Sequence, residues 1–228
     1  GADLPKVMAT GAIMNPGGVP GAPQLDIDEI KAVVVEGAKL GKHTAAHAHG
    51  AQGIINSVLA GVRTIEHGTL IDDEAIAMMA DNGVFLVPTL VIHDLWIDNQ
   101  KNQEFPKFLI EKSNSVMQQG IEGLHKAIAA GVQIAMGTDA GTNFNYHGHN
   151  SSEIIVYVEK GFMTPMEALQ SATQTAAAAI DMDQKLGTLE KGKFADCLVL
   201  DNNPLVDIKG LADPNNINMV MKGGLPVD

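Results

Sequence analysis

The chain repeats a pattern in which an amphipathic stretch ends in glycine and a short apolar run follows. The glycines are Gly41, Gly61, Gly83 and Gly131, and the apolar runs after them span residues 44–47, 62–66, 84–87 and 132–136. Glycine just past a helix end supplies a left-handed C-cap, and runs this short are typical of buried parallel strands. The pattern predicts strands that alternate with helices, and therefore an α/β fold with a parallel sheet.

The amphipathic stretches between these runs predict the helices. Asp26 and Glu29 have the spacing of a capping box, so a helix is expected from Asp26 to Leu40. Thr164-Pro165 begins another helix, with threonine as N-cap and proline at the first helical position. Further helices are expected over residues 51–59, 73–81 and 107–129.

The alternation of helical stretches with short apolar runs ends after about Asp181. Residues 186–193 have the composition of turns, and strands are expected from Phe194 to Asp201 and from Met219 to Lys222. The pattern therefore predicts two domains, a β/α domain over residues 1–181 and a small C-terminal β-appendage over residues 182–228.

Residues that can bind a metal stand where the predicted strands end. His47 and His67 each follow a helix-ending glycine by six residues, and the same count after Gly83 reaches Thr89. Asp139, between glycines, follows Gly131 by eight residues. Active-site residues of parallel α/β folds lie at the carboxyl ends of the strands. The two histidines and the aspartate should therefore reach equal heights on neighbouring strands. Because two imidazoles and a carboxylate suit a catalytic metal, we predict a metal site there.

Four further residues are candidates for contact with a substrate. His49 follows His47 on the same face of its strand, and the shared count from glycine favours His47 as the ligand. Tyr146 and His147 lie in the glycine-rich loop after Asp139, and Arg63 lies in the apolar run at 62–66. We predict that His49 supports the metal site or contacts the substrate. Tyr146, His147 and Arg63 are predicted to contact the substrate.

Composition excludes several classes of partner. The net charge is −12, from 15 basic and 27 acidic residues, and no basic run is present, so nucleic acid and anionic membranes are not expected partners. No stretch approaches the ~18 apolar residues of a membrane span. The single cysteine, Cys197, suits a reducing cytosol, so a cytoplasmic location is expected. The start, without Met or a signal-peptide pattern, leaves secretion open.

Several motifs resemble those of the amidohydrolase superfamily. Its strand-five, strand-six and strand-eight signatures are similar to AAHAHG at 45–50, TIEHG at 64–68 and GTDAG at 137–141. Residues 186–196 resemble its C-terminal signature. KVMATG at 6–11 is similar to the strand-four segment of prolidases and Xaa-Arg carboxypeptidase-like metallopeptidases.

The resemblance implies a partial TIM-type barrel, from about strand four to strand eight, and an appendage that is half of a composite β-sandwich. It also implies one or two divalent metals, usually zinc, bound by His47 and His67. Lys6 matches the lysine that carbon dioxide converts to a carbamate, an anionic ligand that bridges two metals. An unmodified ammonium would be costly in an apolar strand. Asp139 matches the aspartate that binds metal and acts as general base. The implied reaction is hydrolysis of an amide or peptide C–N bond, in a small amide or dipeptide-like substrate, by metal-activated water.

The chain also departs from the family pattern. The His-x-His of strand one is absent, and five predicted strands cannot close an eight-stranded barrel. An open sheet edge and an exposed apolar interior favour either a homo-oligomer or a complementing N-terminal segment. Two alternatives therefore stay open: a catalytically incomplete fragment that at most binds metal, and a deaminase of the same superfamily. Lys6 argues against the deaminase, because mononuclear deaminases generally do without that bridge.

Overall fold

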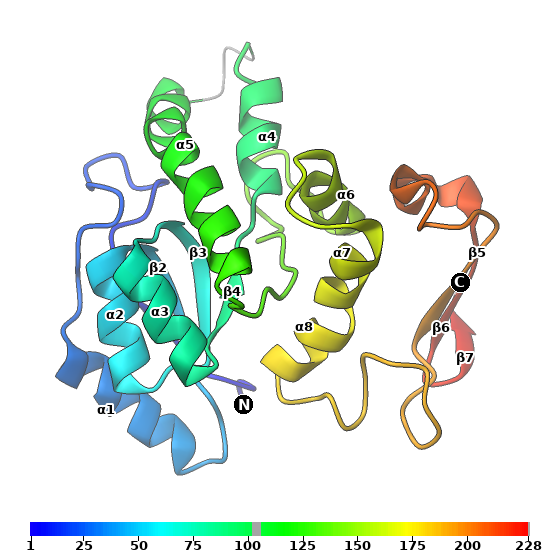
Figure 1. Cartoon of the computed structure of the whole chain (residues 1–228), viewed down its shortest axis with the longest axis horizontal. Helices are drawn as coiled ribbons and strands as arrows, with labels where there is room; N and C mark the ends of the chain where they lie inside the picture. The colour runs from blue at the N-terminus through cyan, green and yellow to red at the C-terminus, as the bar shows by residue number, and fades with distance from the viewer. Residues whose placement is uncertain (102–105, 228) are drawn as a thin grey trace. The chain divides into compact units, whose positions relative to one another are not determined.

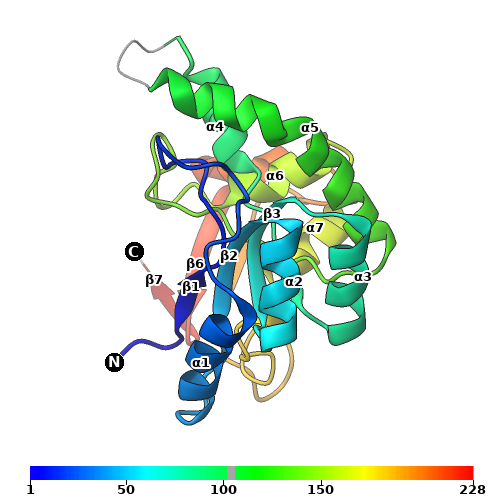
Figure 2. The same ribbon diagram turned by 90° about the vertical axis from the view of Figure 1, so that its left-hand side faces the viewer.

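The structure, a computed structural model, describes residues 1–101 and 106–227 and divides the chain into two compact units, Gly1–Ile134 and Ala135–Asp228. Figures 1 and 2 show the chain in two views. The predicted domain boundary after residue 181 stays a prediction. Within the second unit, helices give way to an antiparallel sheet beyond that point.

The first unit contains a parallel sheet, as the alternating pattern predicted. Its strands are β1 (Lys6–Met8), β2 (Ala45–Gly50), β3 (Thr64–Leu70) and β4 (Phe85–Val87). They lie in the order β1-β2-β3-β4, and each neighbouring pair is parallel. The α/β fold is therefore confirmed, whereas the partial TIM-type barrel stays a prediction.

The helices of the first unit cover this sheet. They are α1 (Ile27–Ala38), α2 (Ala51–Ala60), α3 (Asp73–Asn82), α4 (Val91–Asp98) and α5 (Lys107–Ala129). Helix α2 packs on β2 and helix α5 on β3 (Figure 1). Side chains such as Ala46, Ile54 and Ile65 are fully buried. Gly61 and Gly83 adopt the predicted left-handed conformation after α2 and α3, with φ of 93° and 64°.

The strand expected over residues 132–136 does not form. Ile134 makes only an isolated bridge to Leu86, next to a 2.9 Å hydrogen bond from Leu86 N to Gln133 O. The backbone N–H of Met136 donates instead to Ser171 O at 2.9 Å. The strand prediction was wrong because this donor is used outside the sheet.

The second unit combines short helices with a small sheet. Its elements are α6 (Ser151–Glu159), α7 (Pro165–Ala172), α8 (Gln174–Ala179), β5 (Cys197–Leu200), the 3-10 helices η1 (Ile208–Ala212) and η2 (Pro214–Asn216), β6 (Ile217–Lys222) and β7 (Leu225–Val227). The predicted N-cap Thr164 and the predicted Pro165 at the first helical position begin α7, where Thr164 also forms a capping box with Glu167 that was not predicted. The sheet is antiparallel in the order β5-β6-β7; β5 is shorter than expected, and β7 was not predicted.

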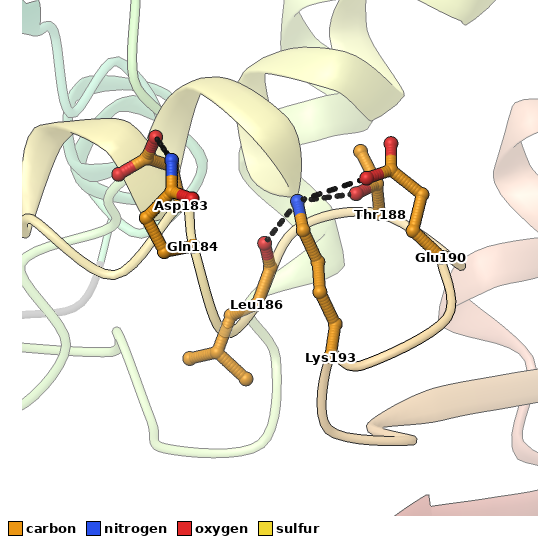
Figure 3. Close-up of polar contacts among 6 residues, drawn as sticks. All are labelled: Asp183, Gln184, Leu186, Thr188, Glu190 and Lys193. Atoms are coloured by element: carbon orange, nitrogen blue, oxygen red, sulfur yellow. Dashed lines mark hydrogen bonds and ion pairs between the residues drawn. The ribbon is translucent and has the colours of Figure 1, made fainter.

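One lysine, Lys193, links several residues of the turns predicted over residues 186–193 (Figure 3). Lys193 Nζ donates to Thr188 Oγ1 at 2.6 Å and to the carbonyl of Leu186 at 3.4 Å. It also forms an ion pair with Glu190 at 3.7 Å. These contacts hold the segment between α8 and β5 in a compact loop.

Within residues 1–101 and 106–227, no helix combines the length and apolar character that crossing a membrane requires.

Candidate metal centre

Three imidazoles meet at the carboxyl ends of β2 and β3. The ring centroids of His47 and His49 are 4.7 Å apart, those of His47 and His67 4.7 Å, and those of His49 and His67 4.8 Å. One nitrogen from each ring lies within 4.8 Å of the other two. This spacing is compatible with a single ion held by all three rings after a small contraction, since zinc–nitrogen bonds are about 2.0–2.1 Å long.

The sheet brings the rings together through an irregularity at His67. His47 and His49 share a face because side chains alternate along a strand. His67, however, pairs with Ala48, whereas Glu66 pairs with His47. The expectation of equal heights was therefore wrong by one residue. In a regular strand His67 would face away from the other two rings, but its φ of 74° and the adjacent register shift turn the side chain toward them.

Two threonine hydroxyls are hydrogen-bonded to the histidine rings. Thr69 Oγ1 lies 2.9 Å from His49 Nδ1, and Thr89 Oγ1 lies 2.7 Å from His67 Nδ1. These contacts use Nδ1 and leave Nε2 of both rings for a metal. His47 Nε2 is buried and has no hydrogen-bond partner among the described residues. An orphaned buried nitrogen beside two oriented rings fits a bound cation.

All three imidazoles favour their neutral form. Burial, followed by the charge of Lys6, lowers the pKa of His47 to about 4. Burial, followed by the charge of His47, lowers the pKa of His49 to about 3. Burial and the charges of His49, His47 and Lys6 hold the pKa of His67 well below its usual value. At neutral pH each ring therefore keeps a lone pair, which coordination of a metal requires.

Lys6 belongs to the surroundings of the cluster. In the β1–β2 register Met8 pairs with His47, so Lys6, two residues before Met8, lies on the same face of the sheet as His47. The Lys6 side chain is exposed in this structure. The cost expected for an ammonium in an apolar strand therefore does not arise here.

Asp139 lies in the second unit, in a loop built by Asn145. Its φ is 52°, in the left-handed region. The Asn145 side chain, 2% exposed, donates from Nδ2 to Thr138 O at 2.6 Å and to Asp139 O at 3.1 Å, and its backbone carbonyl accepts from Gly141 N at 2.8 Å. The cluster defined within the first unit therefore consists of the three histidines and Lys6, and the predicted role of Asp139 stays a prediction.

The predicted substrate contacts lie in different surroundings. Tyr146 and His147 are exposed in the same loop as Asp139. Arg63 precedes β3, at the end opposite to His67, and its guanidinium lies 5.5 Å from the centroid of the Phe85 ring. This position favours a cation–π contact on the far side of the sheet, so contact of Arg63 with a substrate stays a prediction that the strand geometry does not favour.

Sequence reasoning did not assign a role to Thr69, Thr89 or Asn145. The count from Gly83 did reach Thr89, at the position that histidine occupies after two other glycines. A hydroxyl at that position was a usable signal, because metal-binding histidines usually donate their second N–H to a neighbouring acceptor. No comparable pattern marks Asn145, whose partners are backbone carbonyls.

The fold and this cluster define a class of protein, an α/β protein with a candidate metal centre at the carboxyl edge of a parallel sheet. The family model described as "Amidohydrolase family" matches residues 1–227. The chain belongs to the amidohydrolase family, and the resemblance inferred from the motifs is confirmed.

Named relatives agree with this assignment. An ochratoxinase from Aspergillus niger is 33% identical over 225 residues, which are 98% of this chain and 46% of the relative. A Xaa-Pro dipeptidase solved with bound methionine has 38% identity and a TM-score of 0.90, covering 100% of this chain and 55% of that one. A prolidase complexed with N-methylphosphonate-L-proline has 36% identity and a TM-score of 0.91, with coverages of 100% and 55%. The chain thus spans about half the length of the relatives that it matches.

Proposed function

We propose that this chain forms the metal-binding part of a hydrolase that cleaves an amide or peptide C–N bond in a small substrate. The observation that carries the proposal is the cluster of three buried, neutral imidazoles at the carboxyl ends of β2 and β3. Membership of the amidohydrolase family supports the same chemistry.

Each residue has a stated role in this proposal. His47 and His67 hold a divalent metal, zinc by preference, with His49 as a third ligand or a contact to the substrate. When bound, the metal supplies Lewis acidity that lowers the pKa of water. The Lys6 amine reacts with carbon dioxide to a carbamate, with loss of one proton, and so becomes an anionic ligand for one or two ions. Asp139 accepts a proton from the attacking water and donates it to the leaving nitrogen.

The names of the relatives suggest the class of substrate. A Xaa-Pro dipeptidase and a prolidase point to dipeptides, and an ochratoxinase is a further relative of similar identity. We propose a small dipeptide-like or N-acyl amino acid substrate, with Tyr146 and His147 at the site where it enters. The cytoplasmic location also remains part of the proposal.

Zinc binding by the full chain tests the metal centre. Purified protein should bind zinc at one or two equivalents in a competition titration, and intact mass under mild conditions should exceed the sequence mass by one carbon dioxide. His47→Gln should lose zinc, whereas His125→Gln, on the exposed face of α5, should bind like the parent. Equal zinc affinity in both variants would refute the assignment of His47.

Turnover separates the proposal from the alternative of a catalytically incomplete fragment. Assays should follow Xaa-Pro dipeptides, N-acyl amino acids and an ochratoxin. Turnover that Asp139→Asn removes without loss of zinc supports hydrolysis with Asp139 as base, and Asp183→Asn, in an exposed turn, is the matched control. Bound zinc without turnover on any of these substrates favours a metal-binding fragment that needs further polypeptide.

A further inference from the structure

Thr89 combines a costly backbone conformation with one specific side-chain contact. Its φ is 54°, in the left-handed region, which β-branched side chains strongly disfavour. The residue is 8% exposed, and its hydroxyl lies 2.7 Å from His67 Nδ1, 22 positions away in the sequence. A glycine at this position would relieve the strain but would remove the hydroxyl. Strain retained at a buried polar contact indicates that the contact has a function.

His67 is itself held in an unusual conformation. His67 and Gly68 are both left-handed, with φ of 74° and 59°. A Cβ added to Gly68 would lie 2.6 Å from Leu86 Cδ1, so the chain packs closely at this turn. The backbone therefore aims the imidazole toward His47 and His49, but it leaves rotation about the ring axis and the choice of protonated nitrogen undecided.

We propose that Thr89 is the positioning residue that sets the tautomer and ring orientation of His67, so that Nε2 presents its lone pair to the metal. This inference rests on the proposed metal centre. The neutral ring carries one proton. When Nδ1–H donates to Thr89 Oγ1, Nε2 is free to coordinate; when the hydroxyl donates to Nδ1, the proton sits on Nε2 and blocks coordination. The backbone of Thr89 holds Oγ1 2.7 Å from His67 Nδ1, within reach of an Nδ1–H that it can accept.

Thr69 provides an internal comparison. Its hydroxyl lies 2.9 Å from His49 Nδ1, but its φ is not in the left-handed region. Removal of the Thr69 hydroxyl should therefore alter His49 and leave the tautomer of His67 unchanged, which makes Thr69→Val the matched control.

The test uses four variants of the full chain and two measurements. Thr89→Val keeps the shape but lacks the hydroxyl, Thr89→Ser keeps the hydroxyl, and Thr89→Gly relieves the backbone strain without it. Nitrogen-15 spectra of the histidine rings, recorded at pH 8 without metal, report which nitrogen of His67 is protonated. Zinc competition titrations report the affinity of each variant.

The expected pattern separates positioning from a purely structural role. In the parent and in Thr89→Ser, His67 should carry its proton on Nδ1. Thr89→Val and Thr89→Gly should lose that preference and bind zinc about 10–100-fold more weakly. Thr89→Ser, which retains the hydroxyl, should bind zinc with an affinity within about threefold of that of the parent.

An unchanged Nδ1–H tautomer in Thr89→Val and Thr89→Gly would overturn the inference. Parent-like zinc affinity in both variants would also overturn it. The tautomer is measured in metal-free protein, so it decides the role of Thr89 even if the parent binds no zinc and the proposed function fails. If Thr89→Val does not fold, the pair Thr89→Ser and Thr89→Gly makes the same comparison.

Discussion

At the scale of single residues, the centre depends on imidazoles that burial keeps neutral. His47 and His49 are each 5% exposed, and the pKa values of the two rings are lowered to about 4 and about 3. Both rings take up protons in the unfolded chain near pH 6.5 but resist protonation in the folded one. The same burial that prepares the lone pairs for a metal therefore makes the metal-free fold sensitive to acid.

The free energy of unfolding should fall as the pH is lowered from about 6.5 toward 4. In this window the unfolded state binds more protons than the folded state, so acid favours unfolding. The slope should reach about 1.4 kcal/mol per pH unit for each fully shifted ring. Urea unfolding followed by the fluorescence of Trp96, which is buried in the first unit, measures it.

The control for this pH dependence is a variant that lacks one of the rings. His49→Gln should reduce the slope between pH 4 and 6.5 by about one proton. Carboxylates also titrate near pH 4, so the difference between the parent and His49→Gln carries the test. Identical slopes in the parent and His49→Gln would contradict the proposed burial effect.

At the scale of elements, local signals set where several helices begin. Asp26 Oδ1 accepts from Glu29 N at 2.9 Å, and Glu29 Oε2 accepts from Asp26 N at 2.9 Å. Each contact satisfies a backbone N–H that the first turn of α1 would otherwise leave unpaired. Helix α1 packs on α2, which in turn lies against β2, so the cap contributes to the layer beneath the histidines.

Replacement of Asp26 by alanine should destabilise the first unit by about 1 kcal/mol, the usual loss for an N-cap side chain. Asp28→Ala removes an exposed acid from the same turn without removing the cap, and its effect should be only a few tenths of a kcal/mol. Urea midpoints read from Trp96 fluorescence compare the two variants. A loss in Asp28→Ala as large as that in Asp26→Ala would show that charge near the helix start, rather than capping, is responsible.

At the scale of the whole molecule, the small sheet carries an uncovered apolar row. Leu198 pairs with Val220, and Val220 pairs with Val227, so the three side chains lie on one face. They are 52%, 38% and 50% exposed. A contiguous exposed apolar strip on a sheet favours association with another surface, in line with the predicted homo-oligomer or complementing segment.

We expect the chain to self-associate through this row, and Val220→Lys to raise the dissociation constant at least about tenfold, since a buried lysine lacks a partner in an apolar contact. Asn202→Lys, which adds the same charge to an exposed loop next to β5, is the control. Sedimentation velocity over a range of concentrations measures the effect. A parent chain that is monomeric throughout would exclude this row as a contact between copies and favour its use by another segment.

Local sequence determined much of this protein by itself. The capping box at Asp26, the N-cap threonine at 164 and the glycines after α2 and α3 marked helix ends correctly, because these signals act within a few residues. The alternation of helices with short apolar runs was sufficient for the parallel sheet, since buried strands and amphipathic helices have different periods. The motifs around His47 and His67 were sufficient for the family.

Only the tertiary structure decided the finer arrangement of the site. The left-handed turn at His67, its register with Ala48 and its contact with Thr89 depend on strand pairings between residues far apart in the sequence. The missing strand at 132–136 is of the same kind, because a backbone donor at Met136 found its acceptor in Ser171. The local pattern identifies residues that could bind a metal, but which ring nitrogen is available to an ion depends on hydrogen bonds that form only after the strands have paired.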